Sequence, residues 1–382
     1  MTSVERHEAR YQRRKARREE ARRKRNEGYT FEAVTDFNNL RKAFYSARKN
    51  VNWKASVQRY GVNVLKHSME ASDALRKGKC ITKGFIEFDI NERGKKRHIT
   101  SVHISERVVQ KSVCDYGIVP VMEKSLIYDN GASQKGKGTD FARERLKRHL
   151  REYYRRNGST GYILLGDCHD FFGSINHDLV EKNMRKMIID QRLVDLTMEF
   201  IRPFDRGLGL GSQVCQINAV SYQNDLDHCI KEEKRCKYYA RYMDDFYIIC
   251  KTKEEARELL DFLKEKYKEY YIDLNPNKTQ IVKLTHGFVW LQDRVYLTEN
   301  GKVINKPGRM CITRNRRKMK AISKRLEAGE IDYERVRNFY ASHKGYLQHK
   351  NAYRSMKNMD RLYNELFIRR FINGQSCYAQ QG

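Results

Sequence analysis

The segment at residues 238–250 constrains the fold of this chain more than any other. Aromatic and β-branched residues flank Asp244 and Asp245 on both sides, a pattern that predicts two short strands joined by a tight turn. Strands this apolar are expected to be buried, and burying two adjacent carboxylates is costly unless something neutralises them. Divalent metal ions are the usual partners of clustered carboxylates. A turn whose aspartates simply face water is the alternative, and a second acidic element in the chain would decide between the two.

The charge of the chain indicates a polyanionic partner. Its 382 residues include 77 Lys and Arg against 48 Asp and Glu, for a net charge of +29. Nucleic acid is the leading candidate, because each phosphate contact by a cation releases bound counterions. A membrane surface also attracts cations, but we find no apolar run that would span a bilayer and predict a cytoplasmic protein without a membrane partner. Nine scattered cysteines without zinc-site spacing are predicted to be core residues in a reducing compartment.

A second carboxylate follows a short apolar strand predicted at residues 161–166. Asp167 ends this strand, and Phe171 and Phe172 come shortly after it. Asp167 can face Asp244 if the two strands lie side by side in one antiparallel sheet. Two such carboxylates can bridge two Mg²⁺ ions roughly 3.5–4 Å apart, a geometry that serves phosphoryl transfer. We interpret Asp170 as a supporting or structural residue.

Several cationic and glycine-rich segments suit contacts with nucleotides. Residues 13–25 are rich in arginine and have no apolar face, which predicts a solvated helix or an unstructured arm that either contacts RNA or only aids solubility. Residues 84–99 predict a hairpin whose Lys96 and Arg97 either line a triphosphate or face solvent as ordinary surface cations. The glycines of residues 207–211 allow a backbone to approach a base pair or a ribose closely.

Two patterns are interpreted as something other than sites. Residues 131–138 nearly match a phosphate-binding loop, but Gly138 stands where a magnesium-binding Ser or Thr is required, so we exclude a nucleotide triphosphatase. Asp225, Asp227 and His228 form a polar cluster, yet residues two apart do not share one face of a helix. We therefore expect this cluster to belong to a surface helix.

The last third of the chain supplies a lysine, a hairpin and basic helices. Lys278, on a predicted turn, can donate a proton to a pyrophosphate leaving group if it lies near the metal site, and is otherwise an ordinary surface lysine. Residues 287–292 predict the start of a short hairpin. Beyond residue 306 we predict helices over residues 314–326, 332–348 and 353–371, whose interleaved aromatics and cations suit a surface that grips a duplex.

These motifs, in this order, resemble a reverse transcriptase over residues 84–371. Tyr-Met-Asp-Asp at residues 242–245 is similar to the family's Tyr-x-Asp-Asp, and Asp167 matches its first catalytic aspartate. The resemblance implies an α+β fold, a right-hand polymerase with fingers, a palm built on an antiparallel ferredoxin-like sheet, and a helical thumb. It implies a basic N-terminal extension at residues 1–55, fingers at 56–160, a palm at 161–298 and a basic thumb at 299–382.

The resemblance also implies a role for each matching residue. The implied catalytic residues are Asp167, Asp244, Asp245 and Lys278. Two Mg²⁺ ions, with Mn²⁺ as an alternative, would be held by Asp167, Asp244 and the backbone carbonyl of Cys168. The residues implied to contact the incoming nucleotide and the nascent pair are Lys96, Arg97, Phe172, Leu210, Gly211 and Gln216. The implied primer grip contains Gly287, Phe288, Trp290 and Leu291.

Phe172 lies where reverse transcriptases place the aromatic residue that blocks a ribose 2′-hydroxyl, so the resemblance implies dNTPs as monomers, with an RNA template and a DNA or RNA primer. Residues 210–216 resemble the pattern of diversity-generating retroelement reverse transcriptases of bacteria and prophages, although Cys215 replaces the usual Ser and Gly209 stands where Pro is common. The alternatives are a defence-associated enzyme that copies a dedicated non-coding RNA and, more remotely, a non-catalytic RNA-binding protein. Either retroelement or defence role would involve an accessory protein or a structured RNA.

Overall fold

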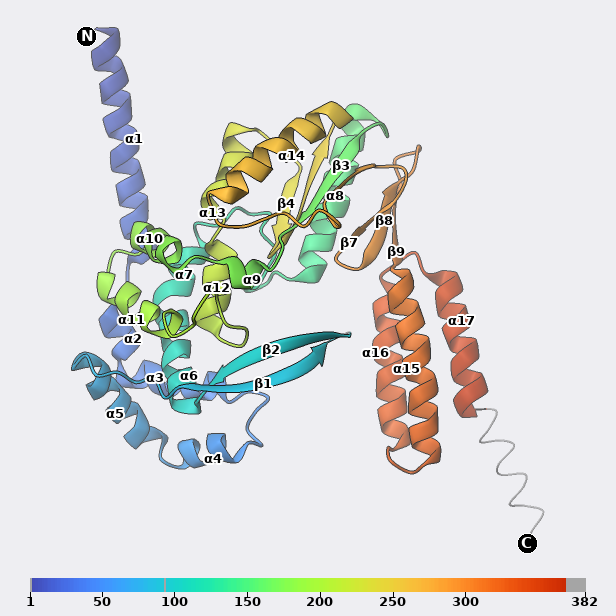
Figure 1. Cartoon of the computed structure of the whole chain (residues 1–382), viewed down its shortest axis with the longest axis horizontal. Coiled ribbons are helices and arrows are strands. Elements are labelled where there is room, and N and C mark those ends of the chain that lie inside the picture. Colours follow the sequence, from blue (N-terminus) through green and yellow to red (C-terminus); the bar gives the residue numbers. More distant parts are fainter. Residues whose placement is uncertain (1, 93, 369–382) are drawn as a thin grey trace. The chain divides into compact units, whose positions relative to one another are not determined.

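The computed structural model describes residues 2–92 and 94–368 (Figure 1). The chain forms two compact units, each assembled from separate stretches of sequence. Unit 1 contains Met1–Ala142, Leu165–Ile248 and Arg257–Gln280, and unit 2 contains Arg143–Leu164, Ile249–Ala256 and Ile281–Gly382. The division into extension, fingers, palm and thumb stays a prediction, and residues 369–382 of the predicted thumb lie outside the described residues.

Unit 1 begins with the helix α1 (Ser3–Asn26), which carries the arginine-rich segment. Thr2 and Glu5 form a capping box that satisfies its first amide groups. Its side chains are exposed along most of its length, as the sequence predicted for a solvated helix. Its C-terminal end is tied down, where Arg22 Nη2 donates to the carbonyl of Arg185 at 3.0 Å and Asn26 Nδ2 to that of Met187 at 3.1 Å.

A helical layer follows in unit 1 and shares one hydrophobic core. The helix α3 packs against α5 and α6, burying Leu40, Phe44 and Val108. Ser112 Oγ also donates to the carbonyl of Val34 at 2.7 Å, which ties α6 to α2. These elements are α2 (Phe31–Thr35), α3 (Phe37–Ala47), α4 (Ala55–Val62), α5 (Val64–Arg76), α6 (Ile104–Val113), the π-helix η1 (Cys114–Ile118) and α7 (Val119–Glu123).

Between α5 and α6, the predicted basic hairpin is confirmed. Strands β1 (Phe85–Glu92) and β2 (Lys95–Val102) pair antiparallel, with Phe85 opposite Val102 and Asn91 opposite Lys96. Nearly every described side chain of β1 is exposed. The hairpin therefore presents its charged side chains to solvent.

The strands that carry the aspartates belong to one four-stranded sheet with the order β4-β5-β3-β6. Because β3 and β5 are neighbours, the expectation that the strand ending at Asp167 lies beside the hairpin that carries Asp244 is confirmed. Gly166 allows this close approach, since a Cβ atom there would lie 2.2 Å from the buried ring of Phe246. The strands are β3 (Tyr162–Asp167), β4 (Tyr239–Tyr242), β5 (Asp245–Cys250) and β6 (Gln280–Lys283).

Helices of unit 1 support the loops that leave this sheet. Tyr267 of α14 (Lys253–Lys268) stacks on Phe246 with ring centroids 5.9 Å apart, and α12 packs against α6 and α11. The other helices here are α9 (Phe171–Ser174), α10 (His177–Met187), α11 (Gln191–Ile201), α12 (Gln213–Ser221), α13 (Asn224–His228) and the π-helix η2 (Cys229–Glu233). A break at residues 222 and 223 separates α12 from α13.

Unit 2 contains a three-stranded sheet and a helical bundle with its own core. Buried Met319, Val336, Met359 and Phe367 join the helices of the bundle. The sheet has the order β7-β8-β9, with β7 (Phe288–Trp290), β8 (Asp293–Leu297) and β9 (Val303–Pro307). The helices are α8 (Thr139–Asn157), α15 (Arg309–Glu327), α16 (Tyr333–Gln348), α17 (Tyr353–Tyr363) and the π-helix η3 (Asn364–Ile368).

These helices confirm the predicted basic helical region, although residues 369–371 of the last predicted helix lie outside the described residues. Within the described part of the chain, no helix combines the length and the apolar character needed to cross a membrane.

Candidate active site

The turn between β4 and β5 carries the paired aspartates. Tyr242 pairs with Asp245, so that Met243 and Asp244 form a two-residue connection. Met243 has a φ of 57°, a left-handed conformation that costs a non-glycine residue about 1–3 kcal/mol and persists only where its surroundings enforce it. The amide of Cys168, directly after β3, donates to the carbonyl of Asp244 at 3.2 Å. This hydrogen bond ties the turn to the strand that carries Asp167.

Asp167 is buried at the end of β3 and meets a lysine from a distant part of the sequence. Lys278 Nζ lies 2.7 and 2.8 Å from the two carboxylate oxygens of Asp167. The turn that carries Lys278 is anchored by Asn275, whose amide donates to the carbonyl of Asp167 at 2.8 Å. The structure therefore brings together Asp167 and Lys278, two of the predicted catalytic residues.

Burial and mutual repulsion dominate the electrostatics of this cluster. Burial raises the pKa of Asp244, and the charge of Asp167 adds to that rise. Burial, with the nearby charges of Asp244 and Asp167, raises the pKa of Asp245 to about 7. For Lys278, burial alone would lower the pKa, but the hydrogen bond and charge of Asp167 raise it above its usual value. Because the site contains one lysine and three carboxylates, its negative charge exceeds its positive charge and favours the binding of a further cation.

The donor atoms fit a hard divalent cation. Carboxylates of Asp167 and Asp244 and the carbonyl of Cys168 are oxygen ligands, the type that Mg²⁺ prefers. No cluster of three or more His, Cys, Asp or Glu side chains suited to a metal is found among the described residues. The set that the resemblance implies, two carboxylates and one carbonyl, is smaller than such a cluster.

The predicted cations of the hairpin are paired in this structure. Lys96 Nζ lies 2.8 Å from Asp89, and Arg97 Nε lies 2.7 Å from Glu92, all on exposed faces of β1 and β2. Burial raises the pKa of Asp244, and the charge of Arg97 opposes a part of that rise, so this guanidinium is close enough to act on the acidic turn. Exposed pairs of this kind are worth about 0–1 kcal/mol and open at little cost.

The glycine-rich segment packs against the same hairpin and against Phe172. The amide of Thr100 in β2 donates to the carbonyl of Leu210 at 3.0 Å, and Gly211 has a φ of +119° beside this contact. The amide of Leu208 donates to the carbonyl of Phe172 at 2.8 Å. At Gly207 a Cβ atom would lie 2.2 Å from that carbonyl, so only glycine fits. Three predicted nucleotide contacts, Phe172, Leu210 and Gly211, are thus connected by backbone packing.

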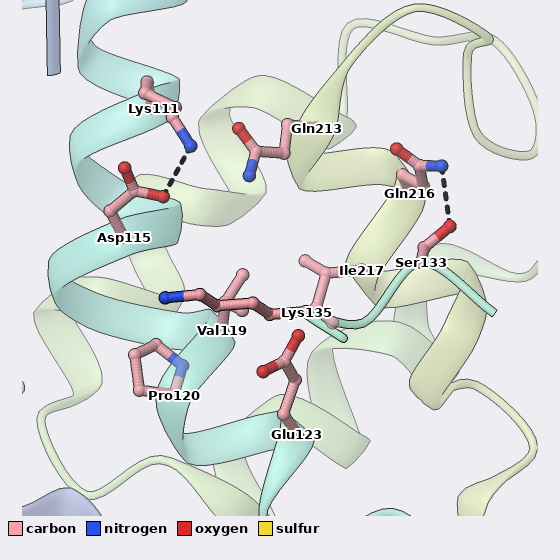
Figure 2. A pocket seen from close by; sticks show the side chains of 10 residues that line it. All are labelled: Lys111, Asp115, Val119, Pro120, Glu123, Ser133, Lys135, Gln213, Gln216 and Ile217. Carbon is pink, nitrogen blue, oxygen red and sulfur yellow. Dashed lines mark hydrogen bonds and ion pairs between the residues drawn. The ribbon is translucent and has the colours of Figure 1, made fainter. Parts of the chain in front are cut away.

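Gln216 lies at the edge of a pocket of about 510 Å³ in unit 1 (Figure 2). Its Nε2 donates to Ser133 Oγ at 2.8 Å. This hydrogen bond joins α12 to the loop of residues 131–138, which nearly matches a phosphate-binding motif. Across the pocket, Lys111 pairs with Asp115 at 2.7 Å, and Figure 2 shows the Lys135 side chain extending through its middle. The remaining lining residues are Val119, Pro120, Glu123, Gln213 and Ile217.

The predicted primer grip forms the hairpin of β7 and β8 in unit 2. Trp290 pairs with Asp293, and Leu291 and Gln292 both have positive φ, of 45° and 71°. Such a two-residue turn matches the twist of the strands but is unusual without Asn or Gly. Phe288 and Trp290 are buried, whereas Val289 between them is exposed. The hairpin predicted from Gly287 onward is therefore confirmed as a structure.

Residues 88–320 match the family described as Reverse transcriptase (RNA-dependent DNA polymerase), which covers more than half of the chain. The chain belongs to the reverse transcriptase family. The matched region contains Asp167, Asp244, Asp245 and Lys278, and this family generally uses divalent metal ions. The predicted resemblance and the α+β fold of the reverse transcriptase type are confirmed, whereas bacterial origin and subfamily stay predictions. A search of curated proteins gives no match.

Solved structures similar to this reverse transcriptase include telomerases. Apo telomerase from Candida tropicalis, truncated from its C-terminal domain, aligns over 58% of this chain and 55% of its own, with 12% identity and a TM-score of 0.46. Telomerase from Candida albicans, in complex with a fragment of telomeric RNA, aligns over 80% of this chain and 61% of its own, with 10% identity and a TM-score of 0.47. The chain thus spans less than two thirds of either telomerase chain.

One buried ion pair of this reverse transcriptase escaped the sequence analysis. The interpretation of Asp227 as part of a surface helix is wrong, because Asp227 is fully buried and Arg241 Nη2 lies 2.6 Å from its carboxylate. Asp225, two residues earlier, is indeed exposed and pairs with Lys186. Arg241 was the feature of the sequence that could have revealed this pair, since an arginine within a buried strand requires an anionic partner. Asp170, also considered above, pairs with Arg206 at the surface.

Proposed function

We propose that this protein is an RNA-directed DNA polymerase that copies an RNA template into DNA. The observation that carries the proposal is the gathering of Asp167, Asp244, Asp245 and Lys278 on neighbouring strands and an adjoining turn. Membership of the reverse transcriptase family supports the same chemistry. Buried carboxylates at the ends of adjacent strands suit nucleotidyl transfer, in which positioning and charge stabilisation do most of the catalysis.

In this proposal each acidic residue has its own task. Asp167, Asp244 and the Cys168 carbonyl would hold two Mg²⁺ ions, with Mn²⁺ as an alternative. When bound, these ions supply activation of the primer 3′-hydroxyl and neutralisation of the pyrophosphate charge. Asp245 supports the site electrostatically. Lys278, held beside Asp167 as an ammonium group, would donate a proton to the leaving pyrophosphate.

The substrate side of the site follows from the contacts around β2. Lys96 and Arg97 bind the triphosphate of the incoming dNTP after exchanging their carboxylate partners for phosphate oxygens. Phe172, held by the glycine-rich segment, excludes a ribose 2′-hydroxyl and so selects deoxynucleotides. Leu210 and Gly211 contact the nascent base pair.

The remaining nucleic-acid contacts are assigned by element. Gln216 and the pocket beside it, with its lysines and amides, contact the template RNA. The hairpin of β7 and β8, with Gly287, Phe288, Trp290 and Leu291, grips a DNA or RNA primer. The basic helices α15 to α17 contact the template–primer duplex.

We propose a diversity-generating retroelement of a bacterium or prophage as the biological setting, on the pattern of residues 210–216. A defence-associated enzyme with a dedicated non-coding RNA is the second candidate, because it would use the same site. Neighbouring DNA distinguishes them: a template repeat with a variable target repeat and an accessory gene supports diversification, and a structured RNA gene without repeats supports defence.

Primer extension on an RNA template with dNTPs and Mg²⁺ tests the proposed activity. The wild-type protein is expected to extend the primer, and Asp244→Asn is expected to abolish extension because it removes a metal ligand. Asp225→Asn is a matched control, since this exposed aspartate only pairs with Lys186 at the surface. Extension that survives Asp244→Asn would refute the assignment, and template binding without extension by the wild type would favour a non-catalytic RNA-binding protein.

A further inference from the structure

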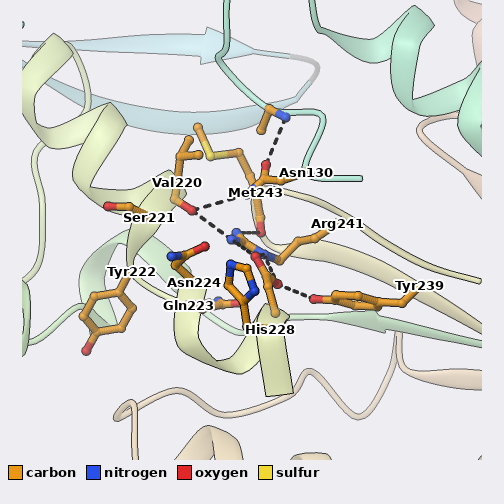
Figure 3. A network of polar contacts seen from close by, with 12 residues as sticks. Asn130, Val220, Ser221, Tyr222, Gln223, Asn224, His228, Tyr239, Arg241 and Met243 are labelled. Atoms are coloured by element: carbon orange, nitrogen blue, oxygen red, sulfur yellow. Dashed lines mark hydrogen bonds and ion pairs between the residues drawn. The ribbon is translucent and has the colours of Figure 1, made fainter. Parts of the chain in front are cut away.

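Arg241 is a buried cation directly before the Tyr-Met-Asp-Asp turn, and its side chain reaches three separate elements (Figure 3). Its Nη1 donates to the carbonyl of Met243 at 3.1 Å, and its Nη2 donates to the carbonyl of Val220 in α12 at 2.8 Å. The same guanidinium pairs with Asp227 of α13, through Nε at 2.9 Å and Nη2 at 2.6 Å. Figure 3 shows Arg241 between Met243 and Val220, with Tyr239 on the opposite side.

Asp227 is the counter-ion of Arg241, and its negative charge offsets the cost of burying the guanidinium. It is fully buried, and it also accepts a hydrogen bond from the hydroxyl of Tyr239. The main chain of Arg241 is fixed as well, because its amide donates to the backbone carbonyl of Asp129 at 3.2 Å and its carbonyl accepts from the amide of Gly131 at 3.0 Å. Hydrogen bonds therefore fix both the main chain and the guanidinium of Arg241.

The energetics indicate that this ion pair does more than hold the core together. Replacing a buried ion pair with apolar residues of similar volume is often neutral or stabilising, so stability alone does not account for it. The distinctive contact is the one to Met243, whose left-handed conformation must be enforced by its surroundings. A charged donor to the Met243 carbonyl supplies such a constraint, at the peptide bond that joins Met243 to Asp244.

We propose that Arg241 is a positioning residue that holds the Asp244-bearing turn in register with α12, and that Asp227 holds Arg241. This inference rests on the proposed polymerase function and assigns roles to two residues outside the predicted site. Because α12 follows the segment of Leu210 and Gly211, the guanidinium connects the nucleotide side of the site to the metal-binding turn. A small displacement of Asp244 would slow nucleotide transfer with little effect on template binding.

The test compares three variants: Arg241→Gln, Asp227→Asn and the double variant Arg241→Gln/Asp227→Asn. Each single variant leaves one buried charge uncompensated and is expected to lower Tm. The double variant has no charge at either of these two positions and can retain an amide–amide hydrogen bond, so it is expected to recover most of that loss. The contact to the Met243 carbonyl weakens because the shorter, neutral glutamine replaces the arginine. Arg192→Gln, at a surface ion pair with Asp190 and Glu32, is the matched control.

For the double variant we expect kcat to fall about 10–100-fold, with template binding and the KM for dNTP near the wild-type values. Amide hydrogen exchange of residues 242–246 is expected to rise, a readout that requires no catalysis. Recovery of kcat together with Tm, or unchanged exchange in the turn, would overturn the positioning role. If the wild-type protein itself fails to extend a primer, the polymerase proposal fails, while the exchange measurement still decides whether Arg241 orders the turn.

Discussion

Replacing Gly166 by alanine is expected to disrupt the contact between the two strands that carry the catalytic aspartates. Gly166 directly precedes Asp167 in β3, and an added Cβ atom would lie 2.2 Å and 2.3 Å from two ring atoms of Phe246 in β5. Phe246 is buried and stacks on Tyr267, so its ring has little room to withdraw. The new methyl group must therefore push the strands apart or displace the ring.

The size of the effect follows from overpacking. Forcing an extra methyl group into a well-packed core costs about 1–3 kcal/mol. At about 2–4 °C per kcal/mol, the Tm of Gly166→Ala should fall by roughly 2–12 °C. Because Asp244 directly precedes the displaced strand and Asp167 follows Gly166, we also expect kcat to fall about ten-fold or more at temperatures where the variant is folded.

A double-mutant cycle with Phe246→Leu provides the assay. Leucine lacks the ring atoms that would meet the new methyl group, so Gly166→Ala should cost less in this background than in the wild type. Thermal unfolding reports stability, and primer extension on RNA reports kcat. Gly345→Ala is the control, since Gly345 lies within the helix α16 with no atom within 4 Å of an added Cβ, and alanine there should preserve or raise Tm.

Two results would refute this reasoning. The first is a Gly166→Ala protein whose Tm matches that of the wild type, because β3 and β5 would then tolerate the methyl group. The second is that the effects of Gly166→Ala and Phe246→Leu on Tm are additive, which would mean that the new methyl group does not clash with the Phe246 ring. A lower Tm with unchanged kcat would show that the strands adapt without moving the aspartates.

Three further predictions concern substrates. Phe172→Val should raise the use of NTPs relative to dNTPs by about ten-fold, measured by competing the two in primer extension, and an unchanged ratio would rule out its role as a sugar filter. Asp89→Asn frees Lys96 and should lower the KM for dNTP by at most about five-fold, because an exposed ion pair is worth about 1 kcal/mol or less; a higher KM would contradict this. Replacing Arg14, Arg17 and Arg18 of α1 with glutamine should reduce the slope of log affinity for single-stranded RNA against log salt by about 2, and an unchanged slope would mean that α1 contacts no RNA.

Much of the site was predictable because its signals are local. The hairpin around Asp244 follows from apolar strands on each side of a two-residue turn, a pattern carried by adjacent residues. The strand before Asp167 and the basic hairpin of β1 and β2 follow in the same way from short-range periodicity. The order of these motifs along the chain then indicated the family.

The partners of these residues were decided only by the tertiary structure. No local pattern places β3 beside β5, or brings Lys278 to Asp167 across 111 residues of sequence. Asp227 was misplaced for the same reason: its helix is short and polar, and its burial depends on Arg241 arriving from a neighbouring strand. Periodicity reports which face of an element avoids water, whereas strand order and the pairing of charges depend on contacts between segments that are far apart in the chain.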